Sequence, residues 1–152
     1  MSGIRVLLVE DEPLIAKNIA MYLNNHDYEV SAIAYDPDEA LFQLKRNPPD
    51  LAILDINLEA DRDGIELARY INEHNNIPFV FLTSYSDKDT LGRAKATNPY
   101  GYIVKPFNEK TLFATIEIAL FNHARDLNRH VPRLDPVKIN RQLVTPLSER
   151  DF

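Results

Sequence analysis

The chain of 152 residues has no cysteine, no tryptophan and only four glycines. The absence of cysteine excludes a disulfide framework and a thiolate metal site. Apolar runs such as residues 6–9 fall far short of the roughly 20 residues that a membrane-spanning helix needs, and the N-terminus lacks the hydrophobic region of a signal peptide. The sequence therefore predicts a soluble, cytoplasmic protein with no membrane partner.

Positive charge is scarce in most of the chain, which has a net charge of −6. Residues 123–152 contain six Lys or Arg and four Asp or Glu, and this leaves a net charge of −8 for residues 1–122. An acidic body of this kind disfavours direct binding to the phosphates of a nucleic acid. The length predicts one domain with an appendage rather than two ordinary domains.

Short apolar runs alternate with segments of helical spacing. Strands are expected at residues 4–9, 28–34, 51–54, 78–82 and 101–104, and helices are expected to begin at Pro13 and Pro37, to span 63–74 and 86–97, and to begin again after Asn108. Parallel strands need crossover connections, which place helices on both faces of the sheet. The pattern therefore predicts a doubly wound α/β fold with a parallel sheet.

The end of the chain differs in character from the rest. Three prolines interrupt the segment after His130, and the apolar periodicity ends there. We expect one domain at residues 1–125 and a linker or tail at residues 126–152. Residues 145–152 contain a Ser-x-x-Asp helix-start signal, so we expect the tail to lead to a helical output domain.

Polar side chains follow the expected strands, at the sheet edge where open α/β proteins carry their functional sites. Glu10 and Asp11 follow the first strand, Asp55 the third, Thr83 the fourth and Lys105 the fifth. Two carboxylates about 4 Å apart repel by roughly 4 kcal/mol at an effective dielectric constant of about 20, so a cation must compensate them. Lys105 is one candidate. Mg²⁺ is the other, because few ligands, all of them oxygen, suit Mg²⁺ better than Zn²⁺ or Ca²⁺.

This arrangement gives Asp55 the properties of a nucleophile. Mg²⁺ held by few protein oxygens keeps open positions that can take a phosphoryl oxygen, and the backbone carbonyl of Asn57 can supply a further ligand. Carboxylates form acyl phosphates when the charge on the transferring group is neutralised. Mg²⁺, Lys105 and the Thr83 hydroxyl can each neutralise one phosphoryl oxygen.

Four motifs, in order across residues 3–125, resemble the receiver domain of bacterial response regulators, whose sheet has the strand order 2-1-3-4-5. They are Leu-Leu-Val-Glu-Asp-Glu (7–12), Ile-Leu-Asp-Ile-Asn (53–57), Phe-Leu-Thr-Ser (81–84) and Gly-Tyr-Ile-Val-Lys-Pro-Phe (101–107). The resemblance implies that Glu10 and Asp11 form the acidic pair for Mg²⁺ and that Asn57 gives the metal its carbonyl. It also implies that Asp55 binds this Mg²⁺ and accepts a phosphoryl group from a sensor histidine kinase or a phosphotransfer protein.

The resemblance further implies a switch built from Thr83 and Tyr102. In the family the phosphoryl group draws the threonine and the lysine inward, the aromatic ring follows, and the face made by residues 86–97, residues 101–104 and the last helix changes shape. A homodimer through this face is one option, and a cis peptide bond is expected before Pro106. The loop after Asp55 departs from the family pattern, because it lacks Met-Pro and is one residue longer before Gly64.

The sequence thus predicts a phosphoacceptor that catalyses only its own phosphoryl transfer and dephosphorylation. A Mg²⁺-dependent phosphohydrolase would have a second acid where Asn57 stands, and a flavin or nucleotide binder would have a phosphate loop in place of residues 10–12. The output stays open. Residues 145–152 are similar to the opening of LuxR-type helix-turn-helix domains, which implies control of transcription through DNA binding beyond this sequence. A stand-alone receiver that docks on proteins, a LytTR-type output and a disordered tail are the alternatives.

Overall fold

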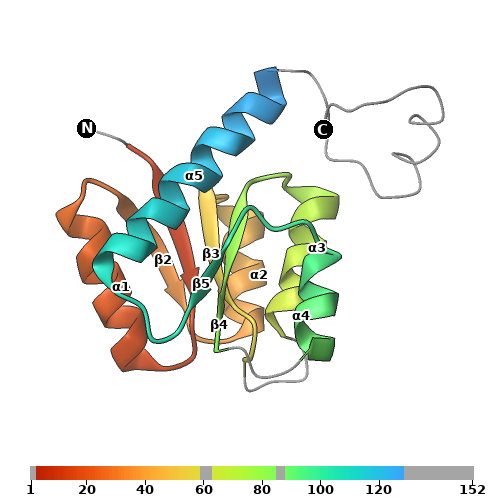
Figure 1. Cartoon of the computed structure of the whole chain (residues 1–152), viewed down its shortest axis with the longest axis horizontal. Helices are drawn as coiled ribbons and strands as arrows, with labels where there is room; N and C mark the ends of the chain where they lie inside the picture. The colour runs from red at the N-terminus through yellow and green to blue at the C-terminus, as the bar shows by residue number, and fades with distance from the viewer. Residues whose placement is uncertain (1–2, 59–62, 85–87, 129–152) are drawn as a thin grey trace. The chain divides into compact units, whose positions relative to one another are not determined.

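The computed structural model of the chain describes residues 3–58, 63–84 and 88–128 (Figure 1). Its elements, in chain order, are β1 (Arg5–Val9), α1 (Pro13–Asn25), β2 (Glu29–Ala34), α2 (Pro37–Arg46), β3 (Leu51–Asp55), α3 (Gly64–His74), β4 (Phe79–Thr83), α4 (Lys88–Lys95), β5 (Tyr102–Val104) and α5 (Glu109–Asn128). The five strands form one parallel sheet in the order β2-β1-β3-β4-β5. The predicted doubly wound fold and its strand order are therefore confirmed.

The sheet is buried between two layers of helices, and this explains why its central strands are mostly apolar. Side chains that alternate along a strand point to opposite faces. Leu7 and Val9 pack with α2, α3 and Ala94 of α4, whereas Val6 and Leu8 pack with α1 and α5. Figure 1 shows α1 and α5 together on the face turned toward the viewer.

Capping side chains define where several helices begin. The Asp36 carboxylate accepts a hydrogen bond from the Glu39 N–H at 2.8 Å, and the Asn108 side chain accepts one from the Thr111 N–H at 2.8 Å. Each bond satisfies a backbone donor that has no partner within its helix. Both helices begin where the sequence predicted, at Pro37 and directly after Asn108. The predicted start of a helix at Ser86 lies outside the described residues.

The long last helix bears on the predicted domain boundary. Helix α5 continues through residue 125 to Asn128, and the tail expected from residue 126 lies, from residue 129 onward, outside the described residues. The boundary itself stays a prediction. Among the helices that the structure describes, none has the length and apolar character required to cross a membrane.

Candidate functional site

The ends of β1 and β3 bring three acidic side chains together. Strands β1 and β3 are neighbours in the sheet, with Val9 paired to Leu54, so the residues that follow them meet at the same edge. One carboxylate oxygen from each of Glu10, Asp11 and Asp55 lies within 4.8 Å of the others. Only oxygen donors are present in this cluster, and such a set suits a hard divalent cation.

Lys105 provides the positive charge of the cluster. Its Nζ atom lies 3.1 Å from Oε1 of Glu10 and 3.2 Å from Oδ2 of Asp55. The peptide bond that joins it to Pro106 is cis, as the resemblance implied. The backbone N–H of Lys105 also donates to the Thr83 carbonyl at 2.7 Å, and this bond fixes the lysine at the end of β5.

Backbone N–H groups hold the second oxygen of both acids. Oε2 of Glu10 accepts from the Glu12 N–H at 3.0 Å, and Oδ1 of Asp55 accepts from the Asn57 N–H at 3.0 Å. Each carboxylate is thus held between a backbone donor and the ammonium group of Lys105. The backbone of Asn57 therefore lies beside Asp55, although its side chain is exposed.

The electrostatics of the site are unbalanced toward negative charge. Burial, and then the nearby charge of Asp55, raise the pKa of Glu10 from 4.5 to about 7, against the opposing effects of the Glu12 N–H and Lys105. Burial alone lowers the pKa of Lys105, but Asp55 and Glu10 outweigh it and the net direction is upward. The lysine consequently remains charged, and among the described residues this one cation lies beside a cluster of three acids.

Thr83 and Tyr102 lie on adjacent strands beside the cluster. Thr83 ends β4 and is buried, and Tyr102 begins β5, where it is paired with Phe81. Burial raises the pKa of Tyr102, and within the described residues its buried hydroxyl has no hydrogen-bond partner. Because this hydroxyl makes no hydrogen bond there, the ring is held by packing against the core, including Phe81, rather than by a polar contact of its hydroxyl.

Gly64 is the residue of the site that sequence reasoning missed. The first residue of α3 packs directly on the end of β3, and a Cβ atom at Gly64 would overlap the carbonyl oxygen of Asp55 and lie 2.9 Å from its carbonyl carbon. The Gly64 N–H also donates to the Ile56 carbonyl at 3.2 Å. The available signal was a glycine directly after Asp63, which caps the helix. In the sequence, Gly64 served only to mark the end of the loop after Asp55.

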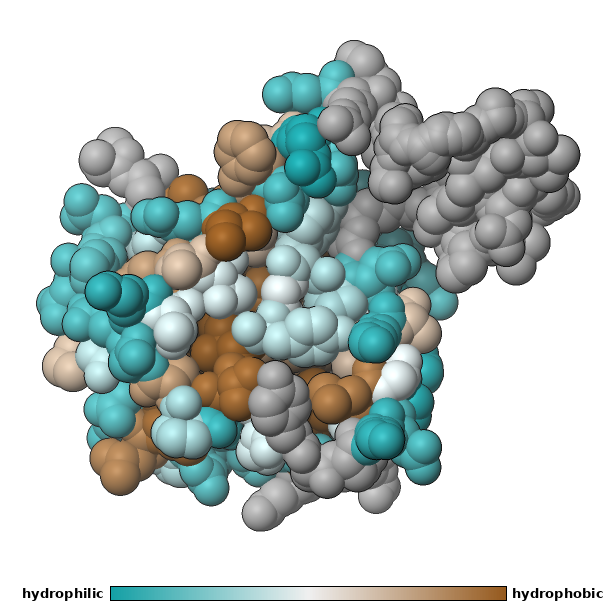
Figure 2. Space-filling model, in the orientation of Figure 1, coloured by the Kyte–Doolittle hydropathy of each residue, from teal (hydrophilic) through white to brown (hydrophobic). Residues whose placement is uncertain are grey.

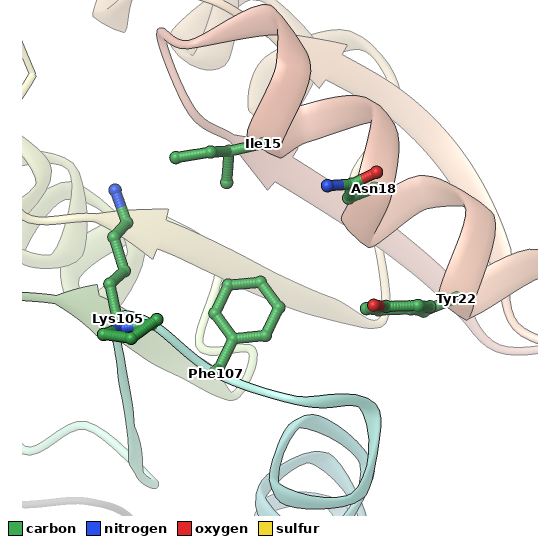
Figure 3. A pocket seen from close by; sticks show the side chains of 6 residues that line it. Ile15, Asn18, Tyr22, Lys105 and Phe107 are labelled. Carbon is green, nitrogen blue, oxygen red and sulfur yellow. The ribbon is translucent and has the colours of Figure 1, made fainter.

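A hollow of about 350 Å³ adjoins Lys105 on the side of α1. Its lining consists of Ile15, Asn18 and Tyr22 from α1 together with Lys105, Pro106 and Phe107. Figure 3 shows the three α1 side chains across from Phe107, with the lysine stem at one end. Figure 2 shows hydrophobic surface between hydrophilic flanks on this face of the molecule.

The sequence matches the family model of the response regulator receiver domain over residues 6–117. It is 36% identical over 142 residues to the transcriptional regulatory protein PdtaR of Mycobacterium tuberculosis, with 92% of this chain and 69% of that protein aligned. It is 36% identical over 117 residues to the nitrogen assimilation regulatory protein NtrX of Azorhizobium caulinodans, of which it spans 26%. It is 35% identical over 118 residues to the regulatory protein VanRB of Enterococcus faecalis, of which it spans 53%.

Solved structures show the same relationship. The signal receiver domain of a modulated diguanylate cyclase from Desulfovibrio desulfuricans G20 superposes with a TM-score of 0.77 at 34% identity, over 82% of this chain and 99% of that one. A CheY-like receiver domain protein from Methanospirillum hungatei JF-1 gives 0.74 at 26% identity, over 82% and 99%. The family match covers well over half of the chain, and the fold agrees with it. The chain therefore belongs to the response regulator receiver domain family of two-component systems.

Proposed function

We propose that Asp55 accepts a phosphoryl group from a histidine kinase or a phosphotransfer protein, with Mg²⁺ bound beside it, and that this controls an output. The observation that carries the proposal is the cluster of Glu10, Asp11 and Asp55, whose oxygens lie within 4.8 Å of one another. Lys105 lies 3.2 Å from the same Asp55. The cluster combines ligands for a divalent cation, a carboxylate nucleophile and a positively charged side chain at one sheet edge.

The residues present fit a bound Mg²⁺. Glu10, Asp11 and Asp55 offer carboxylate oxygens, and the carbonyl of Asn57 would add a fourth. Burial and, after it, the charge of Asp55 raise the pKa of Glu10, and a divalent cation beside Glu10 would favour its ionised form. When bound, Mg²⁺ would neutralise charge on the transferring phosphoryl group.

Asp55 is held ready to react by its two hydrogen-bond partners. The Asn57 N–H fixes Oδ1, and Lys105 holds Oδ2. As a carboxylate oxygen bonds to phosphorus, the phosphorus–nitrogen bond of the donor phosphohistidine breaks, and the imidazole leaves as the neutral ring, because its other nitrogen already carries a proton. Lys105 then pairs with a phosphoryl oxygen, where its charge stabilises the transferring group. The chain catalyses only this transfer and the later hydrolysis.

The surface beside Lys105 supports docking of a protein donor. A phosphohistidine must approach Asp55 over this edge of the sheet. The hollow between α1 and Phe107 provides a largely apolar surface against which the donor protein can pack. Leu14, at the start of α1, is 75% exposed, and large exposed apolar side chains are typical of binding surfaces when they lie beside a groove. We assign this region to the phosphodonor.

Thr83 and Tyr102 would carry the signal to the face formed by α4, β5 and α5. The Thr83 hydroxyl is buried at the end of β4, near Asp55, and the Tyr102 hydroxyl is unbonded within the described residues. Ile118 and Phe121 of α5 are exposed apolar residues that could serve a homodimer. The relative PdtaR is a transcriptional regulatory protein, which supports transcription as the output.

The test is labelling by a small phosphodonor. The protein is incubated with acetyl phosphate, with and without Mg²⁺, and its intact mass is measured. We expect one phosphoryl adduct that requires Mg²⁺ and maps to Asp55. Asp55→Asn, which keeps the shape of the side chain, should remain folded and unlabelled. Full labelling of Asp55→Asn, or equal labelling without Mg²⁺, contradicts the proposal.

A further inference from the structure

Helix α4 is held to the rest of the domain by unusually few contacts. Ala94 alone is buried among its eight residues, all of which the structure describes. Beyond the helix, Thr97 accepts a hydrogen bond at its carbonyl from the Asn72 side chain at 2.8 Å. A helix with so little buried surface takes much of its position from individual polar contacts.

One of these contacts joins α4 to the phosphoacceptor region. Arg93 of α4 pairs with Oδ2 of Asp63 at 3.3 Å, while Oδ1 of Asp63 caps α3 by accepting from the Glu66 N–H at 3.1 Å. The next residue, Gly64, packs on the carbonyl of Asp55 so closely that a Cβ atom would overlap it. A short chain of contacts thus runs from the Asp55 backbone through Gly64 and Asp63 to Arg93.

We propose that the Asp63–Arg93 ion pair holds α4 in its resting position and that phosphorylation of Asp55 releases it. The proposal rests on the phosphoacceptor function argued above. A displacement of the Asp55 backbone would push directly on Gly64, because the two are in contact. Gly64 follows Asp63 in the chain, so the displacement would reach the acidic residue of the ion pair. This connection is separate from the one through Thr83 and Tyr102.

The coupling works in both directions. If the pair favours the resting conformation, its removal raises the population of the conformation that accepts the phosphoryl group. The side chains are 48% and 27% exposed, so the pair is partly screened by solvent. A pair of this kind shifts a two-state equilibrium by at most about fivefold. Removal of the pair should therefore raise the initial rate of labelling by acetyl phosphate by up to about fivefold.

The experiment compares four single variants, and the double variant of Arg93→Gln and Asp63→Asn, with the natural protein. Arg93→Gln removes the cation, and Asp63→Asn removes the anion while retaining a side chain that caps helices equally well. Arg93→Lys keeps the charge. Lys95→Gln removes an exposed positive charge from the same helix and serves as the control. Labelling rates in Mg²⁺ and hydrogen exchange of α4 amides, before and after labelling, are measured for each.

We expect Arg93→Gln and Asp63→Asn to label faster and to exchange faster in α4, with only slightly lower urea midpoints, because the partly exposed pair adds little to the stability of the folded state. Their double variant should match the single variants, because both remove the same interaction. Arg93→Lys and Lys95→Gln should resemble the natural protein. Phosphorylation should accelerate α4 exchange in the natural protein but add little in Arg93→Gln.

Three results would overturn the proposal: equal rates in Arg93→Gln and Lys95→Gln, additive effects in the double variant, or unchanged α4 exchange. A natural protein that takes no label would instead refute the phosphoacceptor function and, with it, the coupling. In that case the exchange rates of the unlabelled variants still decide whether the pair holds α4.

Discussion

The metal-free protein should lose stability as the pH rises from about 4.5 to about 7. Replacement of Glu10 by glutamine should abolish this loss. The Glu10 side chain has no exposed surface, and burial together with the charge of Asp55 raises its pKa from 4.5 to about 7. In the unfolded chain the same carboxyl group ionises near its ordinary value. Between the two values the folded state therefore binds more protons than the unfolded state.

The sign follows from that difference. Stability falls as the pH rises wherever the folded state binds more protons, so the contribution of Glu10 is fully present below pH 4.5 and is lost as the pH passes 7. Each pKa unit corresponds to 1.36 kcal/mol, so the shift from 4.5 to about 7 corresponds to a loss of roughly 3 kcal/mol. That loss is a large fraction of the 5–15 kcal/mol that typically separates folded from unfolded states.

The measurement is urea unfolding at several pH values between 4 and 8, with a metal chelator present. Glu10→Gln is compared with the natural protein, and Glu12→Gln, which alters an exposed acid two residues away, serves as the control. We expect the difference in unfolding free energy to change with pH for Glu10→Gln and to stay flat for Glu12→Gln. Parallel pH profiles for Glu10→Gln and the natural protein would refute the electrostatic argument.

The same experiment with Mg²⁺ tests the metal site. At one hundred times its dissociation constant, a ligand of the folded state adds about 2.7 kcal/mol. Mg²⁺ should therefore offset most of the loss near pH 8 in the natural protein. It should stabilise Glu10→Gln less, because one acidic ligand is missing.

Three further predictions concern single residues. Lys105→Ala should lose labelling by acetyl phosphate without weaker Mg²⁺ binding in calorimetry, because the lysine competes with the metal for Asp55. Gly64→Ala should cost roughly 1–3 kcal/mol in urea unfolding, since its Cβ would overlap the Asp55 carbonyl, whereas Gly92→Ala, with open space around it, should gain roughly 0.5–1 kcal/mol. Asp36→Ala should cost roughly 1 kcal/mol through the lost cap of α2, and Asp36→Asn should restore the stability.

The sequence predicted the fold because its signals were local and repeated. Apolar runs of strand length alternated with segments of helical spacing. This alternation is typical of a parallel sheet with helices on both faces. The positions of Glu10, Asp55 and Lys105 after their strands then implied that they would meet, since parallel strands end at one edge. The structure brings them within ion-pair distance, although their roles stay predictions.

Contacts that depend on exact tertiary packing could not be predicted in this way. Nothing local indicates that Gly64 touches the Asp55 carbonyl or that Arg93 reaches Asp63, because these pairs lie on different elements whose relative position is set by the whole core. Helix α4 illustrates the same limit. Its sequence shows helical signals, but only the packed structure shows that Ala94 alone is buried.

Lys105 connects the charge of the site to β5, a short edge strand of the sheet. In the resting state its Nζ atom lies between Glu10 and Asp55, while its backbone N–H is bonded to the Thr83 carbonyl. A phosphoryl group on Asp55 would draw the ammonium group of Lys105 away from Glu10. A bound Mg²⁺ would then neutralise the negative charge of that buried carboxylate. The resulting pull acts on β5, which has three residues and a single neighbouring strand. An edge strand held by so few hydrogen bonds yields before the buried centre of the sheet does, which is why a change of charge at Asp55 would appear at Tyr102 and at the surface around it.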